Sequence, residues 1–440
     1  LTDAGKLAEG SAKALTDQSA EKAVTVFNSL GFARKELVSL PECFASGAET
    51  ADGEAIPVQA AQGTVKALVT IPSCGAVTLI PCETAGSLPE GASIAVTEDG
   101  YRMENALIAA EINRNGEVTS FVLKGSGREF AASPMNRFRM YKDVPRMFDA
   151  WDIDSNYVDQ EVEAAADITT EILAEGLEAV LRVKGRIGSS FFTQDIRLRA
   201  DSRRLEFETE IDWRELHRLL KTVFPVDVYA ENGINEIQFG YVERPAHRSR
   251  QYDKDRFEVC NHRYSALCNG SHGAAVLNDC KYGISMNANA LELTLLRAAA
   301  SPEMRADNKI HRFTYGFTAW EGSFTDSDVV RQGYELNVKP LVTAGSTKTF
   351  RAVQVEKENV ILDTLKPAED GSGDLILRLY ESKKASVSTR VACSFGGCRA
   401  YLCDMLENAE EEIPVENGGI RLEFKAFEVK TVRVQTGLHT

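Results

Sequence analysis

Long apolar segments and runs of basic residues are both lacking in this 440-residue sequence. No stretch approaches the roughly 18 apolar residues that a membrane-spanning helix needs, so we exclude a membrane protein. Acidic residues outnumber basic ones by 65 to 50, which gives a net charge of -15 without any run of Lys and Arg. Because nucleic-acid binding needs a basic surface, we expect no nucleic-acid partner. The start, Leu1–Lys6, has no basic segment followed by an apolar one, and we expect no signal peptide.

The familiar short motifs of catalysis and metal binding are lacking as well. The sequence contains no GxSxG, no HExxH, no P-loop and no GxGxxG with a helix after it. Its nine cysteines form no CxxC pair, and the closest group (Cys393, Cys398 and Cys403) has no histidine beside it. An odd number leaves at least one thiol free. We therefore expect reduced thiols in a cytoplasmic protein and no zinc site built from cysteine.

Helical patterning is confined to the first residues. Small and apolar side chains recur at helical spacing from Thr2 to Ala20, which predicts a helix there. Farther along the period is two, as where Leu205, Phe207 and Ile211 alternate with acidic residues. Such alternation indicates antiparallel strands with one face on a core and one in water, and two large sheets packed face to face account for it. Interleaved helices are missing, so we do not expect a doubly wound fold.

The length predicts several domains, and we place their limits at residues 1–22, 23–99, 100–335 and 336–440. In the last of these, Lys366–Asp374 (KPAEDGSGD) predicts a turn or short linker. Near the end, the alternation at Leu422 and Phe424 shifts parity to Phe427 and Val429. That shift predicts a bulge or bend in a single final strand.

Three stretches break the strand pattern with dense polar and aromatic residues. In the first, Tyr141–Tyr157, Asp149 and Asp152 flank Trp151. Sugar sites combine an aromatic face for the ring C–H groups with acids for the hydroxyls, so this stretch predicts sugar contact. A structural Trp151 in the core among solvated acids is the alternative. Asp149 and Asp152 are also candidates for the paired carboxylates of glycoside hydrolysis, but sequence spacing does not establish the distance between them.

The second stretch, Glu236–Arg263, is rich in opposed charges. It includes Arg244 and His247 and predicts either an ordered loop with many ion pairs or a binding site. Its two histidines, His247 and His262, lack the spacing of metal ligands, so we expect no metal there.

The third stretch, Leu277–Gly283, directly follows an apolar strand. Asn278, Asp279 and Lys281 suit a sugar-contacting turn, while an ordinary β-turn explains the same residues. The residues by themselves therefore predict a multi-domain β protein, with a sugar-facing loop region as one interpretation.

The same stretches carry a family resemblance. In order and spacing, the chain resembles the cytosolic-type α-mannosidases of glycoside hydrolase family 38 at KDVPRMFDAWDID, EIQFGYVERPAHR, DRFEVCNHRY, AAVLNDCKYG and HRFTYGF. A further string near the start, VTVFNSLGFARKELVSLP, resembles the strand that follows the helical bundle in that family. The resemblance extends from about Val24 to the end of the chain.

The resemblance implies a particular order of domains and the absence of the catalytic domain from this chain. Residues 1–22 would be the tail of a helical bundle, 23–99 a small β domain, 100–335 a large antiparallel β super-sandwich of the galactose-mutarotase-like kind, and 336–440 a terminal β domain. In the family, a zinc ion and an aspartate nucleophile lie in an N-terminal α/β domain whose motifs this chain lacks. We therefore expect no catalytic residue and no metal site in this chain, and zinc in a missing catalytic domain.

The implied activity is that of a retaining α-mannosidase, which releases mannose from glycans through a covalent intermediate. This chain would supply the scaffold and the wall of the sugar subsites and would be inactive alone. The partners would be a mannose-containing oligosaccharide, the missing catalytic domain and, in a homo-oligomer, a second copy of the chain. A lectin-like carbohydrate-binding module and a structural or oligomerisation domain are the alternatives. The substrate-binding candidates are Asp149, Trp151, Asp152, Arg244, His247, Asn278, Asp279 and Lys281.

Overall fold

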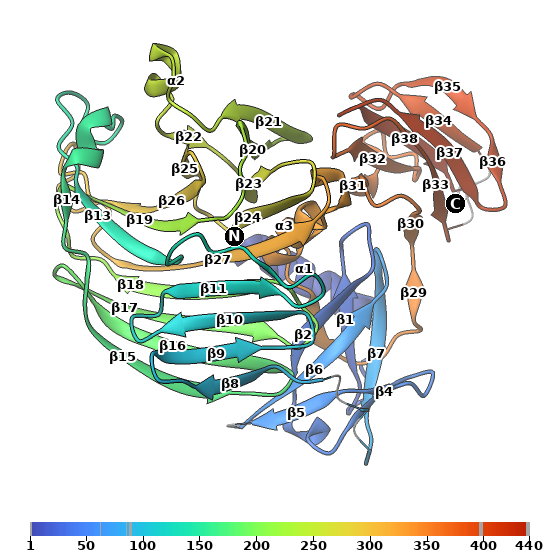
Figure 1. Cartoon of the computed structure of the whole chain (residues 1–440). Coiled ribbons are helices and arrows are strands. Elements are labelled where there is room, and N and C mark those ends of the chain that lie inside the picture. Colours follow the sequence, from blue (N-terminus) through green and yellow to red (C-terminus); the bar gives the residue numbers. More distant parts are fainter. Residues whose placement is uncertain (1, 62, 85, 88–89, 396–398, 437–440) are drawn as a thin grey trace. The chain divides into compact units, whose positions relative to one another are not determined.

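The computed structural model describes residues 2–61, 63–84, 86–87, 90–395 and 399–436. The chain divides into two compact units. The first comprises residues 1–88, 238–241 and 338–440, and the second comprises residues 89–237 and 242–337. Strands dominate both units, which confirms the predicted mainly β fold (Figure 1). Of the described helices, none is long and apolar enough to cross a membrane.

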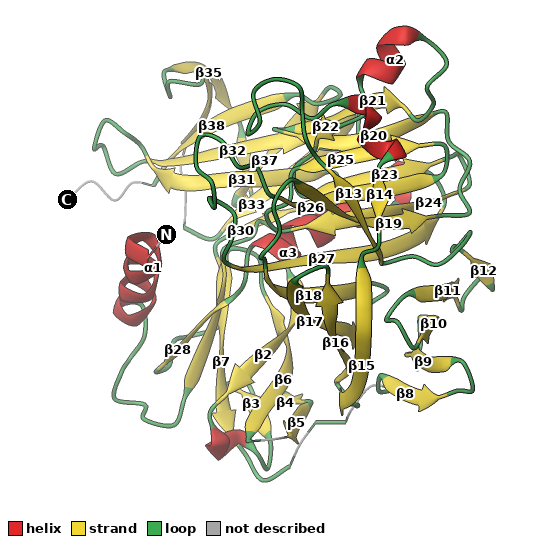
Figure 2. Ribbon diagram, turned by 90° about the vertical axis from the view of Figure 1, so that its left-hand side faces the viewer, coloured by secondary structure: helices red, strands yellow, loops and turns green. Residues whose placement is uncertain are grey.

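The first unit begins with the predicted N-terminal helix. This helix, α1 (Thr2–Ala14), lies next to β28 (Leu341–Ala344; Figure 2). It ends at Ala14 rather than at the predicted Ala20. The Thr16 hydroxyl donates to the carbonyl of Ala12, and the Asp17 N–H donates to Ser346 O at 2.7 Å. The chain thus leaves the helix to form a bridge with the segment after β28, a long-range contact that outweighs helical propensity.

Among the described residues, four antiparallel sheets form the rest of the first unit. One contains β1 (Val24–Asn28), β3 (Ala48–Thr50), β4 (Ala55–Ile56), β7 (Gly75–Pro81), β28 and β29 (Phe350–Arg351). A second contains β2 (Arg34–Leu40), β5 (Val58–Ala61) and β6 (Thr64–Ile71), with the short helix η1 (Glu42–Phe44) after β2. A third contains β30 (Val353–Val355), β33 (Val387–Cys393), β36 (Val415–Glu416) and β37 (Gly419–Phe424). The fourth contains β31 (Val360–Pro367), β32 (Leu375–Glu381), β34 (Arg399–Cys403), β35 (Ala409–Ile413) and β38 (Val429–Gln435).

The predicted turn and the predicted final strand have different outcomes. The segment after Pro367 connects β31 to β32, and Ala368 N donates to Asp374 O at 2.9 Å, which confirms the turn. The single bent final strand is wrong. The parity shift marks a tight turn between β37 and β38, which belong to different sheets. There Phe427 has a φ of 57°, and Lys425 N donates to the Glu428 carboxylate at 2.7 Å.

Three antiparallel sheets build the second unit (Figure 1). The first contains β8 (Ser93–Val96), β9 (Gly100–Glu104), β10 (Ile108–Asn113), β11 (Val118–Leu123) and β12 (Arg128–Glu129). The second contains β13 (Arg137–Lys142), β14 (Glu161–Val162), β19 (Arg218–Pro225), β22 (Val259–Cys260), β25 (Gly283–Asn287) and β26 (Ala290–Arg297). The third contains β15 (Ala165–Ala174), β16 (Glu178–Ile187), β17 (Ser190–Arg199), β18 (Leu205–Asp212), β20 (Asn232–Ile237), β21 (Gly240–Pro245), β23 (Tyr264–Cys268), β24 (His272–Asn278) and β27 (Ile310–Glu321).

The alternating pattern of β18 produces the packing between the two larger sheets. Leu205, Phe207 and Ile211 are fully buried, whereas Glu208 and Glu210 are exposed. The ring of Phe207 lies 5.8 Å from that of a phenylalanine on β19, so side chains of the two sheets meet in one core. Burial of a phenylalanine side chain contributes roughly 2–3 kcal/mol. The predicted face-to-face packing of two large sheets is therefore confirmed.

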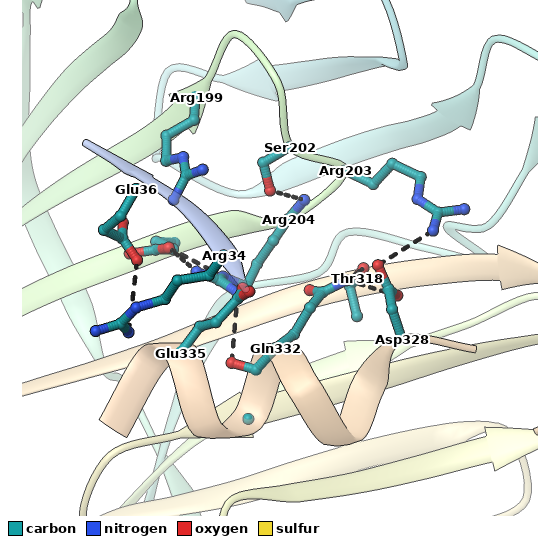
Figure 3. A network of polar contacts seen from close by, with 12 residues as sticks. Arg34, Glu36, Arg199, Ser202, Arg203, Arg204, Thr318, Asp328, Gln332 and Glu335 are labelled. Atoms are coloured by element: carbon teal, nitrogen blue, oxygen red, sulfur yellow. Dashed lines mark hydrogen bonds and ion pairs between the residues drawn. The ribbon is translucent and has the colours of Figure 1, made fainter. Parts of the chain in front are cut away.

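Short helices complete the second unit: η2 (Ser155–Asp159), α2 (Gln251–Asp255), η3 (Phe324–Asp326) and α3 (Val329–Asn337). The sequence pattern did not predict α3. Figure 3 shows how polar side chains hold it against the large sheet. Arg203 pairs with Asp328 at 3.2 Å, and Gln332 donates to Thr318 at 3.3 Å. The guanidinium of Arg204, which is 4% exposed, donates to the carbonyl of Gln332 at 3.4 Å.

Candidate functional site

The first polar stretch forms a loop between β13 and β14 in the second unit. A hydrogen bond from Lys142 N to Gln160 O, 3.0 Å long, closes its base. The second half of the loop contains η2, and the first half carries Trp151 and the aspartates. The two halves are held by different means, and together they determine where the aromatic side chains point.

A buried cation anchors the second half of the loop. Lys221 of β19 is inaccessible to solvent and contacts the carboxylate of Glu258. Its ammonium also donates to the hydroxyls of Tyr157 and Ser285, at 3.2 and 2.9 Å. Tyr157 in turn donates to Glu258 at 2.8 Å and packs edge-on against Tyr141, with 5.0 Å between ring centroids. Burial, followed by the nearby Glu258 charge, raises the pKa of Tyr157, so its hydroxyl stays a proton donor.

Asp149 attaches the first half of the loop to two distant segments. Its Oδ2 accepts the N–H groups of Ala300 and Ser301, at 2.7 and 3.0 Å. The same oxygen lies 3.1 Å from Nε2 of His217, at the start of β19. Burial alone would raise the pKa of Asp149, but the hydrogen bonds from Ala300 and His217 outweigh it and lower the pKa below its ordinary value. Asp149 is therefore an ionised acceptor with three donors around it.

Arg297, at the end of β26, makes the second attachment. Its Nε donates to the Asp143 carboxylate at 2.7 Å, and its Nη2 donates to the carbonyls of Asp149 and Asp152, at 3.2 and 2.6 Å. Asp143 is 3% exposed. Burial raises its pKa, and Arg297 offsets only part of the increase. The charges of Asp143 and Asp149 are thus both used to hold the loop.

In the same loop, next to the residues that Arg297 and His217 contact, two aromatic side chains form an exposed surface. Phe148 and Trp151 stack with 5.7 Å between centroids and 21° between ring planes. They are 58% and 81% exposed, and Met147 beside them is 60% exposed. Phe148 has a φ of 53°, which is uncommon for a bulky residue and typical of functional loops. We call Phe148 and Trp151 the aromatic pair. Asp152 beside it is exposed, and its carboxylate has no hydrogen-bond partner among the described residues.

The second stretch places Arg244 and His247 differently. Arg244 lies at the end of β21 and donates to the buried Asn235 side chain at 2.7 Å, which is a structural role. His247 is exposed, and its Nδ1 lies 3.8 Å from the Asp253 carboxylate. It borders a cavity of about 490 Å³ beside Tyr229, which is 79% exposed. Of the two residues, His247 is the one in a position to meet a ligand.

The third stretch is a tightly bonded turn after β24. The buried Asn278 side chain donates to His262 O at 2.6 Å and accepts Lys281 N at 2.7 Å. Asp279 accepts Thr314 N at 2.9 Å. The Lys281 ammonium lies 4.4 Å from the ring centroid of an aromatic residue on β27, and burial lowers its pKa. Asn278 and Asp279 thus shape the turn. The second stretch contacts both of the others, through Glu258 with Tyr157 and through His262 with Asn278.

The described residues present no cluster of metal ligands. In that part of the chain, no group of three His, Cys, Asp or Glu side chains is placed to hold a metal ion. Asp143, Asp149 and His217 lie in one cluster, but N–H donors already occupy both carboxylates, so they do not fit a zinc site. Each of the eight described cysteines is free, and Cys398 lies outside the described residues.

The residues that sequence reasoning missed are His217 and Arg297. They contact Asp149 across 68 and 148 residues of sequence. His217 directly precedes β19, Arg297 is the last residue of β26, and these two strands pair directly in one sheet. Their closeness to Asp149 therefore depends on the order of strands in the sheet, which the local sequence pattern does not indicate.

Two family descriptions match the sequence. "Glycosyl hydrolases family 38 C-terminal domain" covers residues 103–305, and "Glycosyl hydrolases family 38 C-terminal beta sandwich domain" covers residues 359–432. "Alpha-mannosidase 2C1" of Homo sapiens is 34% identical over 386 residues, which are 82% of this chain and 36% of that protein. "Alpha-mannosidase G" of Dictyostelium discoideum is 32% identical over 352 residues, which are 75% of this chain and 32% of that protein. The chain thus spans about a third of the length of these relatives.

A solved structure has the same fold. The crystal structure of an alpha-mannosidase from Enterococcus faecalis V583 superimposes with a TM-score of 0.77 and 16% sequence identity. The superposition covers 98% of this chain and 58% of that one. The arrangement of strands therefore persists at low sequence identity.

Proposed function

The chain belongs to glycoside hydrolase family 38 and corresponds to the C-terminal region of the family's members, and from this premise we propose that it is part of an α-mannosidase. In this proposal the aromatic pair and Asp152 form a wall of the cleft that receives mannose-containing glycans. The observation that carries the proposal is the exposed aromatic pair held at a fixed place by charged contacts. Aromatic rings accept the C–H face of a sugar, and a free carboxylate accepts its hydroxyls.

The nucleophile and the zinc ion are proposed to lie in a part of the protein outside this chain. Two observations support this division. The relatives are roughly three times as long as the matched region. Within the chain, the carboxylates of Asp143 and Asp149 are engaged by Arg297, His217 and main-chain N–H groups, which leaves them structural. A zinc ion in the rest of the protein would supply Lewis-acid assistance to the glycosidic bond.

The first helix supports the proposal of a partner domain. Leu7 of α1 and Leu15, the residue that follows α1, are 74% and 59% exposed, although both are apolar. Exposed apolar side chains grouped at one element mark a face that packs against another part of a protein. We propose that this face packs against further helices of the complete protein. We also propose a cytoplasmic location, for which the free state of the described cysteines is the support.

The test compares hydrolysis of p-nitrophenyl-α-mannoside by two proteins in the presence of zinc or cobalt. One is the 440-residue chain, and the other extends through the upstream coding sequence. We expect turnover by the extended protein alone. Turnover by the 440-residue chain would overturn the proposed division, and an inactive extended protein with the chain folded would overturn the assignment as an α-mannosidase.

The role of the aromatic pair is tested in the extended protein by Trp151→Ala. We expect an increase in KM of about tenfold, equivalent to about 1.4 kcal/mol of binding free energy, with a smaller change in kcat. Phe191→Ala is the matched control, because Phe191 is also a half-exposed aromatic (52%) on a strand of the second unit. Equal KM values for Trp151→Ala and the unmodified protein would remove the aromatic pair from the substrate cleft.

A lectin-like module is the second candidate, and the cavity beside Tyr229 and His247 favours it. Such a module would bind mannose as the isolated chain, and Tyr229→Ala would abolish binding. Calorimetric titration of the 440-residue chain and of its Tyr229→Ala variant with mannose decides between the two. Tight binding that Tyr229→Ala abolishes favours the module, because a cleft wall alone offers too few contacts to offset the cost of association. Sedimentation of the same chain tests the third possibility, an oligomerisation domain.

A further inference from the structure

A second cavity lies between the two larger sheets of the second unit. It has a volume of about 590 Å³ and opens at the edge where β14 of one sheet continues into β15 of the other. Phe138 of β13 and Phe192 of β17 both line it and contact each other edge-to-face, with 5.2 Å between ring centroids and 80° between planes. The volume is within the range of small-molecule sites, which is roughly 300–1,000 Å³. None of the sugar candidates from the sequence lines this cavity.

The floor of the cavity is a network of buried amides. Asn136 and Gln194 line it and are 4% and 1% exposed. The Asn136 amide donates to Gly116 O at 3.0 Å and to Gln194 Oε1 at 2.7 Å. Gln194 donates to Thr209 at 2.9 Å and to the Tyr315 hydroxyl at 2.8 Å, and Tyr315 donates to Asn136 Oδ1 at 2.6 Å. Every amide hydrogen is used, so the two side chains have fixed orientations.

The amide groups of the cavity floor can still accept hydrogen bonds. An amide oxygen accepts two hydrogen bonds. The described contacts use one on Asn136 Oδ1 and one on Gln194 Oε1. Each of these two oxygen atoms, in side chains that line the cavity, therefore keeps the capacity to accept one more hydrogen bond. A ligand that satisfies them must bring hydrogen-bond donors, and hydroxyl groups are donors without charge.

The rim is shaped by a bulge in β15. The register with β16 shifts between Ala166 and Thr169, and Asp167 in the bulge has a φ of 56°. The bulge places Ile168 against Gly185 of β16, where a Cβ on Gly185 would lie 2.4 Å from the Ile168 side chain. Bulges often re-aim side chains beside functional sites. Here the bulge adds an apolar wall next to the two phenylalanines.

Charges of both signs surround the rim. Asp167 pairs with Arg186 at 3.0 Å, Arg137 lies 3.9 Å from Glu117, and Glu161 pairs with Arg139. Arg114 and Glu163 add one charge of each sign, so the rim as a whole favours neither an anion nor a cation. The remaining chemistry is acceptor oxygens at the floor and aromatic surface on the walls, which suits a neutral polyhydroxylated ring.

We propose that the cavity between the sheets is a separate binding site for a neutral sugar unit. The sugar hydroxyls donate to Asn136 and Gln194, and its C–H face lies against Phe138. This site is distinct from the aromatic pair, and it does not depend on the proposed mannosidase activity. Its occupation would bridge the two sheets at an edge that is otherwise open.

The test uses the complete 440-residue chain with methyl α-mannoside, glucose and sodium sulfate as probes. Saturation-transfer NMR measures binding, and hydrogen exchange read by mass spectrometry locates it. Ala165→Trp fills the cavity from an exposed position on β15, and Thr169→Trp is its matched control on the same strand outside the cavity. Near-UV circular dichroism confirms that both variants fold.

We expect saturable binding of a neutral sugar with protection of residues 114–117 and 161–168 from exchange. Ala165→Trp should weaken it at least about tenfold, while Thr169→Trp and Trp151→Ala leave it unchanged. Three outcomes overturn the inference: no neutral sugar binds, sulfate displaces it, or Ala165→Trp has no effect. Loss of binding in Trp151→Ala alone overturns the cavity site but supports the aromatic pair, so the two proposals fail separately.

Discussion

The loop that carries the aromatic pair and the cavity between the sheets are held by opposite kinds of polar contact. Charged groups hold the loop, through Lys221 with Glu258 and Asp149 with His217. Neutral groups build the cavity floor, with Asn136 and its amide and hydroxyl partners. A charge inside a protein is stable only beside its partner, whereas a neutral amide needs hydrogen bonds but no counter-charge. The loop should therefore respond to pH and to loss of one partner more strongly than the floor does.

Tryptophan fluorescence follows both regions, because all three tryptophans, Trp151, Trp213 and Trp320, belong to the second unit. Trp213 and Trp320 are buried, at 0% and 1% exposure. Their emission during urea unfolding reports the free energy of unfolding of this unit without a contribution from tryptophan in the first.

The largest effect is expected from Lys221→Met. The substitution leaves the Glu258 carboxylate, whose side chain is 13% exposed, without its cation. Breaking a buried pair from one side costs about 3–5 kcal/mol, and the free energy of unfolding should fall by that amount. The double variant Lys221→Met with Glu258→Gln removes the unpaired charge and should recover part of the loss. A double variant no more stable than the single one would show that the ion pair is not the cause.

Asn136→Ala is expected to lower the free energy of unfolding by about 3 kcal/mol. Gly116 O, Gln194 Oε1 and the Tyr315 hydroxyl each lose a partner. The backbone contributes as well, because Asn136 has a φ of 58°, which alanine tolerates less well than asparagine. The exposed Asn115→Ala is the control and should change the free energy of unfolding by less than about 0.5 kcal/mol. Equal values for the two variants would mean that water replaces the whole network at no cost.

The smallest effect, about 1 kcal/mol at neutral pH, is expected from Asp149→Asn, which keeps an acceptor but loses the charge. The pKa of Asp149 is lowered in the folded protein from an ordinary 3.8. Its contribution is therefore fully present above the ordinary value and is lost as pH falls through the folded pKa. Hydrogen exchange of residues 143–152 gives the free energy of opening of the loop in the unmodified protein and in Asp149→Asn. The difference between these two free energies should be constant from neutral pH to about 5 and should shrink below about 4. A difference that persists unchanged at pH 3 contradicts this assignment.

The strands were the most predictable part of the molecule. The alternation of Leu205, Phe207 and Ile211 with acidic residues predicted a strand where the structure has β18. The helix α3 was missed, since it is short and contains Gly333. A Cβ at Gly333 would lie 3.2 Å from Arg263, so the glycine serves close packing on the sheet at the expense of helical propensity.

The candidate site was predicted in part. The stretch around Trp151 was identified from its composition, and the structure places that side chain in solvent beside Phe148. Whether the eight substrate-binding candidates contact sugar stays a prediction. Asn278 and Arg244 have enough internal partners to explain their presence without a ligand. The sequence pattern contained no signal for the amide floor, because Asn136 and Gln194 lie in segments that resemble ordinary strand ends and strands.

The sequence by itself determined the class of fold, the family and the three polar stretches, because alternation and short motifs are local properties of the chain. Only the tertiary structure decided which polar groups meet. Sheet order brings His217 and Arg297 to Asp149, and the packing of two sheets leaves a cavity over Asn136 and Gln194. The physical reason is that burial and pairing depend on contacts between residues far apart in sequence. The same aspartate is a free ligand-binding group or a structural acceptor according to the donors that the fold places around it.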